Sequence, residues 1–411
     1  MILDTRKKEL IVYGINFAPE LTGIGKYTSD MVDWLVENKV KCTVVTSFPY
    51  YPYWQIQKPY RGFFYKKEVN NNGLLTIYRC PMYVPKKASG FKRILHEASF
   101  LLSSFFVFFL LIFKPKISNI FCVAPPFHLG LVAIFYKFFK GGTITYHVQD
   151  LQIEAAKKLN MVKGKMLLAI FSKIELYIFK NVDEISSISK NMISKLIHQS
   201  NKNVTFFPNW VDNKSFYPIE NSNLNREKWG FSEKDKIVLY SGSIGEKQGL
   251  NQLIELAQFH KFNTQIKFLV ASSGSYSIKL QREVNELNIT NIYFLPLQPN
   301  EVFNEFLNIA DVHLILQKKN AADLVMPSKL TTIMAIGGLA IVSCEKGTEL
   351  YELVNDNKLG ILVEPENTDE LKYTIEKTLN NNYNETRLNA RNFALNSLDK
   401  EIILNKFIKI T

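Results

Sequence analysis

Residues 313–344 read as strand, loop, helix and strand, and this order constrains the fold more than any other stretch. Residues 313–317 (His-Leu-Ile-Leu-Gln) form a short apolar run of the kind that a strand buried in a parallel sheet needs. A polar loop at 318–323 precedes a helix at 330–336, which Gly337 and Gly338 end. Residues 339–343 are a second apolar strand, so the stretch predicts an α/β fold with parallel strands.

The amino end of this helix is a candidate anion site. Pro327 disfavours helix in the residue before it, and Ser328 suits the N-cap position. A helix N-terminus offers unpaired N–H groups and about half a positive charge, to which Lys329 adds a full charge. The alternative is an ordinary capped helix that binds nothing.

Apolar strands recur along the whole chain of 411 residues in two groups. The first group lies at 10–14, 41–46, 119–124, 142–147 and 182–187, and the second at 236–242, 266–271, 291–296, 313–317, 339–343 and 360–363. We therefore predict an N-terminal Rossmann-like domain at 1–208, a second one at 209–385, and a final helical segment at 386–411.

Each predicted domain opens with a glycine-containing turn between its first strand and first helix. In the first domain the turn, residues 16–26, contains Gly23 and Gly25, but Thr28 stands where a dinucleotide fingerprint needs its third glycine. A nicotinamide cofactor is therefore not indicated, although glycines still let the backbone approach a phosphate or sugar closely. The second domain has the turn Ser-Gly-Ser-Ile-Gly-Glu-Lys-Gln-Gly at 241–249.

The charge is uneven. Residues 1–208 hold 28 Lys and Arg against 13 Asp and Glu, an excess of 15, whereas the remainder has 22 against 25. A basic half could face nucleic acid or an anionic membrane, or serve solubility alone. The basic residues do not accompany a known nucleic-acid motif, so we expect no nucleic-acid partner. Four scattered cysteines without a CxxC pair indicate neither zinc nor disulfides, and the polar residues 1–9 show no cleavable signal, which together suit the cytoplasm.

Residues 98–113 are a run of 16 largely apolar residues flanked by Lys92, Arg93, Lys114 and Lys116. As a helix this run is about 24 Å long, short of the roughly 30 Å hydrocarbon core of a bilayer. We interpret it as a buried or membrane-surface helix, with Phe135, Phe138 and Phe139 as neighbours. The aromatic residues 48–54 are either a loop folded on its own rings or a surface for sugar or lipid.

Polar residues follow the strand at 142–147. This strand ends in His147, and Asp150 comes three residues later. Ligands of open parallel sheets bind at the carboxyl ends of the strands, so both residues are candidates for contact with substrate. Either could instead be a structural strand-end residue.

Taken in order, the motifs resemble family 4 glycosyltransferases over about residues 10–405. They are 13–27 (Tyr-Gly-Ile-Asn…Pro-Glu-Leu-Thr-Gly-Ile-Gly-Lys-Tyr), 147–150 (His-Val-Gln-Asp), 240–249 and 327–330 (Pro-Ser-Lys-Leu). Within the family, the chain is most similar to the colanic acid fucosyltransferase and to the L-fucosamine transferases of O-antigen and capsule clusters.

This resemblance implies a GT-B fold, in which two doubly wound domains face a central cleft. It also implies retaining sugar transfer without a metal ion or other cofactor. The donor would lie against the second domain and the acceptor against the first, and the last helix would cross back to the first domain.

The resemblance also assigns roles by position. Ser241, Gly242 and Gly249 would line the donor diphosphate beside Lys247 and Gln248, with Gly23 and Gly25 approaching from the first domain. Backbone near Leu297 and Gln298 would hold the base, Ser328 and Lys329 the phosphate, and Thr332 would approach the ribose.

The sequence departs from the family at three of these positions. Many members have Arg and Lys where Ser243 and Gln248 stand, and a glutamate where Thr332 stands. Phosphate charge should therefore fall more heavily on Lys329, Lys247 and the helix ends. Lys329 would stabilise the leaving diphosphate, and Asp150 or His147 would orient the acceptor hydroxyl or stabilise the cationic sugar.

We therefore expect a glycosyltransferase that moves N-acetyl-L-fucosamine or L-fucose from UDP or GDP to an undecaprenyl-diphosphate-linked saccharide. It would act in the cytoplasm at the anionic inner face of the membrane. Two alternatives remain, a nucleotide-sugar epimerase of the same fold and a non-catalytic nucleotide-binding protein. The apolar run argues against the epimerase, whose substrate is soluble.

Overall fold

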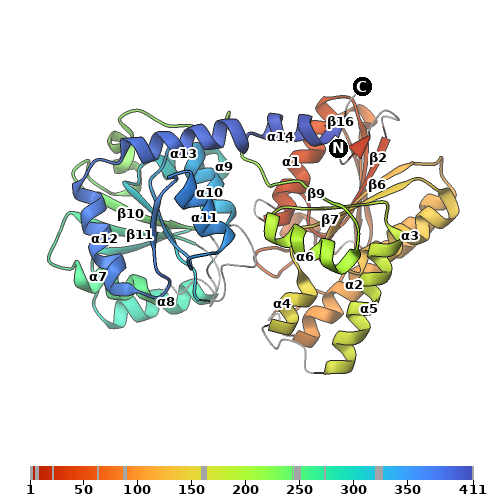
Figure 1. The fold of residues 1–411 in the computed structure, drawn as a ribbon, viewed down its shortest axis with the longest axis horizontal. Coiled ribbons are helices and arrows are strands. Elements are labelled where there is room, and N and C mark those ends of the chain that lie inside the picture. The colour runs from red at the N-terminus through yellow and green to blue at the C-terminus, as the bar shows by residue number, and fades with distance from the viewer. Residues whose placement is uncertain are drawn as a thin grey trace. The chain divides into compact units, whose positions relative to one another are not determined.

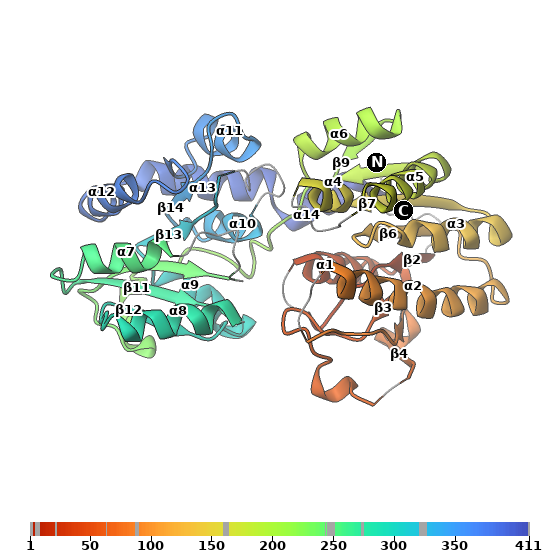
Figure 2. The same cartoon turned by 90° about the horizontal axis from the view of Figure 1, so that it is seen from below.

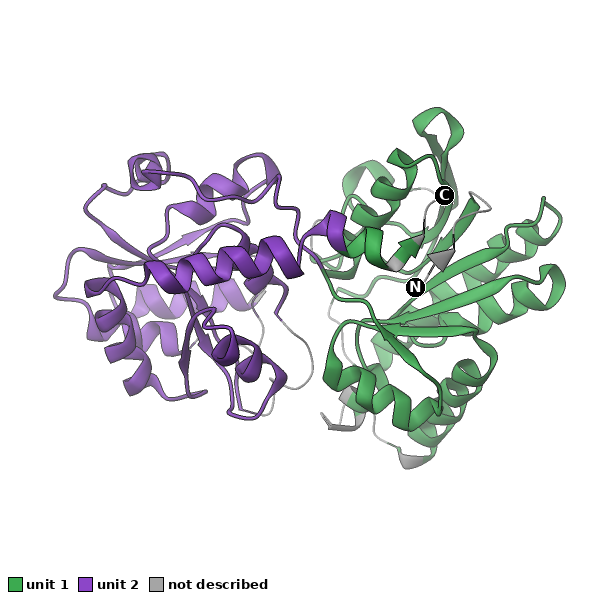
Figure 3. Ribbon diagram, turned by 45° about the horizontal axis from the view of Figure 1, so that its top comes forward, with its two compact units in different colours: residues 1–209, 403–411 green, residues 210–402 purple. Residues whose placement is uncertain are grey.

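The protein is described by a computed structural model that covers residues 3–4, 9–20, 23–62, 64–86, 90–158, 164–242, 244, 251–272, 275–319 and 327–409. The chain divides into two compact units (Figure 3). Unit 1 comprises residues 1–209 and 403–411, and unit 2 comprises residues 210–402. The predicted boundary after residue 208 lies next to this division, which counts residues 386–402 with unit 2 and the last nine residues with unit 1.

Unit 1 is built on an eight-stranded sheet in the order β4-β5-β3-β2-β6-β7-β8-β9. All neighbours are parallel except the edge pair β4–β5. The chain order of the central strands reverses between β2 and β6, as in doubly wound folds. The strands are β2 (Glu9–Tyr13), β3 (Lys41–Ser47), β4 (Lys66–Asn70), β5 (Leu75–Cys80), β6 (Asn119–Ala124), β7 (Thr143–Val148), β8 (Glu184–Ser187) and β9 (Val204–Phe206).

The helices of unit 1 cover its sheet (Figure 1). They are α1 (Gly23–Glu37), α2 (Gly90–Ile112), α3 (Leu129–Lys140), α4 (Gln152–Lys158), α5 (Lys165–Asn181) and α6 (Lys190–Ser200), with 3-10 turns η1 (Lys58–Tyr60) and η2 (Asn71–Gly73). One core cluster joins the inner faces of α2, α3, α5 and α6 to β2, β6, β7 and β8.

Unit 2 has a six-stranded, fully parallel sheet in the order β12-β11-β10-β13-β14-β15. Numbered within the unit, this is the order 3-2-1-4-5-6 of a dinucleotide-binding fold, with its reversal between β10 and β13. The strands are β10 (Lys236–Ser241), β11 (Ile266–Ala271), β12 (Ile292–Leu295), β13 (Val312–Ile315), β14 (Ala340–Ser343) and β15 (Ile361–Val363).

Helices lie on both sides of this sheet (Figure 2). One core contains residues of α9 (Asn300–Asn308), α10 (Ser328–Ala335), α11 (Glu349–Asp356) and α13 (Asn384–Ser397). The other contains residues of α7 (Gln252–Phe259), α8 (Ser275–Glu286) and α12 (Thr368–Asn380), and the 3-10 segment η3 (Ser222–Trp229) precedes β10.

The end of the chain contains more than the final helical segment predicted at 386–411. Three helices follow β15, the last being α14 (Lys400–Phe407), and a short strand β16 (Ile408–Lys409) pairs in parallel with β1 (Leu3–Asp4). The division between the units falls inside α14. The last residues thus complete a two-stranded sheet with the beginning of the chain.

Candidate functional site

The carboxyl edge of the unit 2 sheet, where β10 and β13 diverge, is the place for a ligand in such a fold. β10 ends at Ser241, and Gly242 follows with its backbone N–H bonded to the Ala271 carbonyl at 2.9 Å. α10 begins after β13 at Ser328, so its amino end belongs to this edge. The structure therefore brings together Ser241, Gly242 and the start of α10, as the sequence predicted.

The capping of α10 differs from the prediction. Ser328 is the first helical residue, and the N-cap is Pro327, which has no side chain able to accept from the helix. Ser328 uses its carbonyl oxygen to accept from the Thr331 hydroxyl at 2.7 Å, and its side chain is exposed. Because no N-cap side chain competes, N–H groups of the first turn can serve an anion.

Lys329 lies directly over the glycine turn. Its Nζ is 3.8 Å from the centroid of the Tyr240 ring and 3.5 Å from where a Cβ on Gly242 would be. Gly242 has a φ of 129°, a conformation that other residues rarely adopt, so the backbone of the turn favours glycine here. Burial lowers the pKa of Lys329 to about 7.

The other predicted donor residues of unit 2 are less fully placed. Thr332 lies one turn into α10 and is half-buried, on the same helix as Lys329. Gln298, after β12, accepts from Trp229 Nε1 at 3.3 Å and donates to the Pro296 carbonyl at 2.9 Å. Its side chain is thus held within the unit, and a base contact near Leu297 and Gln298 would come from the backbone. Lys247, Gln248 and Gly249 lie outside the described residues.

In unit 1 the first glycine turn is shorter than predicted. α1 begins at Gly23, not at residue 27, so Gly23 and Gly25 lie in its first turn instead of in a loop. A Cβ on Gly25 would be 3.1 Å from Glu20 Oε2, so a larger residue here would press on the Glu20 side chain. Both glycines still lie at the carboxyl edge of the sheet, after β2.

His147 and Asp150 differ sharply in environment. His147 is 3% exposed, its Nδ1 lies 3.0 Å from Ser186 Oγ, and its ring stacks on Phe121 with centroids 5.4 Å apart. Burial lowers the pKa of His147 to about 3, so this side chain is neutral at pH 7. Asp150 is only partly buried and follows the end of β7. This arrangement favours Asp150 for contact with substrate and the structural alternative for His147.

Sequence reasoning missed a buried carboxylate at the same edge. Glu20 is 3% exposed and accepts from the backbone N–H groups of Tyr50 and Tyr51 at 2.9 and 2.8 Å. Its other oxygen accepts from Asn16 Nδ2 at 2.8 Å. The one signal in the sequence was the pair of polar residues Asn16 and Glu20 in the loop after the first strand. The contacts with residues 50 and 51 leave no local pattern, because they lie thirty positions away.

Helix α2 is longer than predicted, with 23 residues instead of 16, because residues 90–97 are helical too. By length and composition alone it could cross a membrane. Its inner face, however, packs in the core: Tyr13 donates to or accepts from Ser104 at 2.6 Å and packs its ring against Phe108 at 4.7 Å. With 23 residues α2 is not too short to span a bilayer, and the packing of its inner face is the reason to regard it as a helix of the unit 1 layer.

The outer face of α2 exposes a continuous apolar stripe. Stripe residues on α2 that are at least 44% exposed are Phe91, Leu95, Leu102, Phe106, Phe109, Leu110, and just beyond the helix Phe113. Phe105 and Phe135, 4.8 Å apart, link this stripe to Phe139 and Phe138 on α3. Exposed Lys114 and Lys116 follow the helix. An apolar face of this kind with basic neighbours is typical of an interaction surface.

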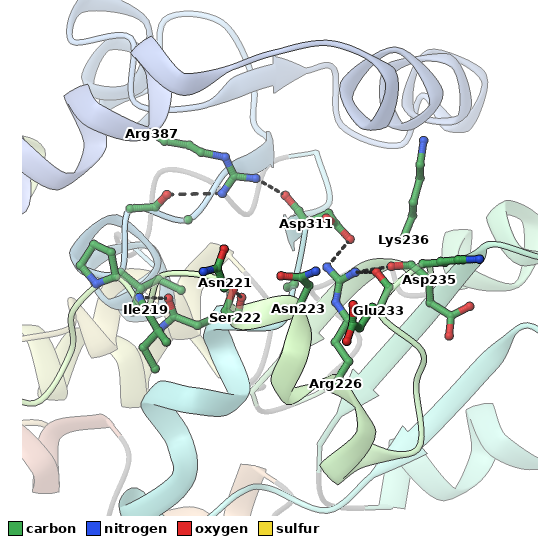
Figure 4. Close-up of a pocket in the computed structure, with 17 residues that line it drawn as sticks. Ile219, Asn221, Ser222, Asn223, Arg226, Glu233, Asp235, Lys236, Asp311 and Arg387 are labelled. Carbon is green, nitrogen blue, oxygen red and sulfur yellow. Dashed lines mark hydrogen bonds and ion pairs between the residues drawn. The ribbon is translucent and has the colours of Figure 1, made fainter.

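A cavity of about 570 Å³ lies at the opposite edge of the unit 2 sheet (Figure 4). It adjoins Lys236 at the start of β10, and Asp311 just before β13. Arg226 pairs with Asp311 at 2.8 Å, and Arg387 donates to the Asp311 carbonyl at 2.6 Å. These charged groups bind one another, and the cavity lies at the amino edge of the sheet, whereas ligands of such folds bind at the carboxyl edge. We therefore assign the cavity no part in the candidate site.

Comparison with known proteins adds two kinds of similarity. Residues 221–396 match the family model of the glycosyl transferases group 1. Over 408 residues the chain is 37% identical to WcaI of Escherichia coli (strain K12), described as a colanic acid biosynthesis glycosyl transferase, covering 97% of this chain and 98% of WcaI.

Two solved structures share the fold at low identity. Sucrose-phosphate synthase from Thermosynechococcus elongatus aligns with a TM-score of 0.74 and 15% identity, covering 97% of this chain and 96% of that one. HepE of Anabaena, in complex with UDP-glucose, aligns with a TM-score of 0.68 and 12% identity, covering 97% and 98%.

Proposed function

Because this chain belongs to the group 1 glycosyl transferases and has the GT-B fold, we propose that it transfers a 6-deoxy-L-sugar from a nucleoside diphosphate to a lipid-diphosphate-linked saccharide. The family decides the class of reaction: the chain is a glycosyltransferase, and the epimerase and the non-catalytic binding protein are set aside. The donor, the acceptor and the retention of configuration are our proposal.

One observation supports a diphosphate donor above all others. Lys329 lies at the amino end of α10 and over Gly242, at the reversal point of the unit 2 sheet. A cation, a helix end and the glycine that follows β10 together suit two adjacent phosphates. The complex of HepE with UDP-glucose, a protein of the same fold, supports a nucleotide sugar.

The proposed chemistry places charge where the structure can receive it. As the glycosidic bond to the donor breaks, negative charge grows on the leaving diphosphate, and Lys329 with the first N–H groups of α10 would stabilise it. The sugar passes through a cationic state. Asp150 would either stabilise this state or orient the acceptor hydroxyl toward it. We propose that these groups suffice without a metal ion or other cofactor.

The proposals for the donor sugar and for the acceptor are supported by similar proteins and by the surface of unit 1. WcaI is described by its part in colanic acid biosynthesis, which supports assembly of an extracellular polysaccharide. The resemblance to L-fucosamine and fucosyl transferases supports N-acetyl-L-fucosamine from UDP, or L-fucose from GDP. An undecaprenyl-diphosphate-linked saccharide would be the acceptor.

We further propose that the exposed stripe of α2 and the phenylalanines of α3 rest on the anionic inner face of the cytoplasmic membrane. The stripe presents large apolar side chains such as Phe106 and Phe113, 54% and 76% exposed, and the flanking lysines would meet lipid phosphates. Docking of this kind would keep the enzyme cytoplasmic and peripheral while a lipid-bound acceptor reaches it.

Incubation of the purified protein with a panel of UDP- and GDP-sugars and a short polyprenyl-diphosphate-linked saccharide tests the proposal. Mass spectrometry should show an acceptor gaining one N-acetyl-fucosamine or fucose residue, with nuclear magnetic resonance reporting a retained anomer. Chelation with EDTA should leave the rate unchanged. A product that carries a plain hexose in preference would overturn the proposed sugar. An inverted anomer would overturn the retaining mechanism, and a loss of rate with EDTA would overturn the proposal that no metal ion is needed.

A further inference from the structure

Glu20 joins two segments at the carboxyl edge of the unit 1 sheet that the sequence keeps thirty residues apart. One is the turn at 14–20, which leads into the Gly23 and Gly25 start of α1. The other is the aromatic segment at 48–60. Oε1 of Glu20 accepts from the N–H groups of Tyr50 and Tyr51 at 2.9 and 2.8 Å, and Oε2 accepts from Asn16 Nδ2 at 2.8 Å. Such bonds to a buried carboxylate are charge-assisted and strong.

The glycine side of this junction is closely packed. Gly25 of α1 lies so close to Glu20 that a Cβ on Gly25 would be 3.1 Å from Oε2 and 3.2 Å from the Glu20 Cβ. Ala18, in the same turn as Glu20, is held from two sides. Its carbonyl accepts from Arg79 Nη2 at 2.9 Å, and its N–H donates to Ser29 Oγ on α1 at 2.7 Å. A shift of the start of α1 is therefore transmitted to Glu20 by contact.

The aromatic side carries exposed rings. Tyr53 is 63% exposed, and Trp54 is half-buried with a φ of 51°, a left-handed conformation that tryptophan rarely adopts. The Trp54 ring packs edge-on against Tyr50 at 5.5 Å and lies 5.3 Å from His96. Tyr50, whose backbone N–H Glu20 holds, thus also fixes the place of Trp54. Aromatic faces of this kind suit the apolar faces of a saccharide.

We infer that Glu20 is a positioning residue that makes acceptor binding depend on donor binding, by tying the glycine turn to the aromatic segment. The inference rests on the proposed function, together with the expectation from the family resemblance that Gly23 and Gly25 approach the donor diphosphate and that the first domain receives the acceptor saccharide. Donor binding would fix the conformation of the turn at 14–20. Through its hydrogen bonds, the Glu20 carboxylate would then fix the backbone at Tyr50 and Tyr51, so that Tyr53 and Trp54 present an ordered surface to the acceptor.

The variant Glu20→Gln tests the inference because it keeps the shape of the side chain. An amide has one acceptor oxygen, so with that oxygen on Tyr50 and Tyr51 its NH2 group meets the NH2 group of Asn16, which must turn over or lose its partner. In the native enzyme the KM for acceptor should fall as donor approaches saturation. In Glu20→Gln the acceptor KM at saturating donor should rise about tenfold or more, whereas the KM at low donor should stay close to native.

The matched control is Asp183→Asn, just before β8 in unit 1, which removes the ion pair with Lys137 at 2.6 Å without touching Arg79, Tyr50 or Tyr51. It should keep the dependence of acceptor KM on donor. Asn16→Ala removes the Oε2 contact together with the Asn16 hydrogen bond to the Tyr50 side chain, and keeps the bonds of Oε1. It should weaken the dependence in part, which provides a reading if Glu20→Gln does not fold. A loss in kcat alone, or an acceptor KM raised equally at low and saturating donor, would overturn the inference.

A second measurement does not need sugar transfer. Titration with UDP or GDP should change the fluorescence of Trp54, identified by its loss in Trp54→Phe, and Glu20→Gln should bind the nucleotide but lack that change. If no donor is transferred yet this pattern is found, the proposed function fails and the coupling stands. If transfer is found and Glu20→Gln keeps the fluorescence change, the coupling fails and the function stands.

Discussion

At the scale of single residues, Lys329 is the side chain whose environment says most about chemistry. Its pKa of about 7 in the free protein should rise when a diphosphate binds, because the anion favours the charged ammonium. Binding then takes up a proton above pH 7, and the affinity for UDP or GDP should fall by up to tenfold per pH unit as the pH rises from about 7.

Isothermal titration in buffers of different ionisation enthalpy measures that proton uptake. Lys329→Arg keeps its charge at every pH and should flatten the profile, whereas Lys329→Ala should lose about 10- to 150-fold in kcat/KM. Native pH dependence in the arginine variant would show that another group titrates. Near-native turnover in the alanine variant would remove Lys329 from the site.

Asp150 and His147 can be separated by paired isosteric changes. Asp150→Asn should lower kcat by at least about tenfold, because a partly exposed carboxylate at the strand end faces the substrate edge. His147→Gln should change kcat little, since the buried neutral ring serves Ser186 and Phe121. Steady-state kinetics with both variants at pH 7 decide between them, and a larger loss in His147→Gln would reverse the assignment.

Residues recognised from sequence were those whose role is local. Ser241, Gly242 and Lys329 came together because a strand end, a glycine turn and a helix start each leave a short-range pattern. Ser328 was placed wrongly as the N-cap because serine and proline both suit a helix start, and only backbone geometry separates them. Glu20 was missed because its partners at 50 and 51 are far away in the chain.

At the scale of secondary structure elements, α2 combines a core face with an exposed apolar face. We expect anionic vesicles that contain phosphatidylglycerol to retain the protein at low salt and to release much of it at high salt. Replacing Phe106 and Leu110, 54% and 61% exposed, by serine should weaken retention by about tenfold or more, because two large side chains no longer enter the lipid.

Phe262→Ser is the matched control for this experiment. Phe262 is 87% exposed but belongs to unit 2, so its loss should leave vesicle binding unchanged. Equal effects of both changes would indicate general stickiness, and retention that ignores salt would indicate insertion of α2 beyond the interface.

Elements with a clear hydrophobic pattern were predicted well, and those without one were not. The parallel strands β6 and β11 match their apolar runs to the residue, since strands covered on both faces are continuously apolar. β4 was missed because Lys-Lys-Glu-Val-Asn is charged, as suits an exposed edge strand. The length of α2 was underestimated because its first eight residues are polar enough to hide the helix from an apolar count.

At the scale of the whole molecule, the two main sheets share the order of their central parallel strands, although the unit 1 sheet also has β4 and β9 at its edges. This shared order explains how the architecture could be predicted from repeated sequence patterns. Both sheets reverse their chain order after the first strand, which places the glycine turns of β2 and β10 at the carboxyl edge of their own sheets. Sequence patterns alone do not show where the last residues belong; the expectation that the last helix crosses back to the first domain came from the family resemblance. Residues 403–411 are counted with unit 1, and their register with β1 is a pairing across nearly the whole chain.

The last prediction concerns this terminal segment. Leu404 on α14 is fully buried and counted with unit 1, so Leu404→Ala should destabilise the protein by about 2–5 kcal/mol. Ile402 on the same helix is 47% exposed, and Ile402→Ala should cost much less. Denaturant unfolding gives both values, and hydrogen exchange read by mass spectrometry localises them. Faster exchange is expected in peptides of β1, which pairs with β16, and of the unit 1 strands β2 and β3, because residues 403–411 are counted with unit 1. A change confined to β10–β15 would place the end of α14 with unit 2 instead.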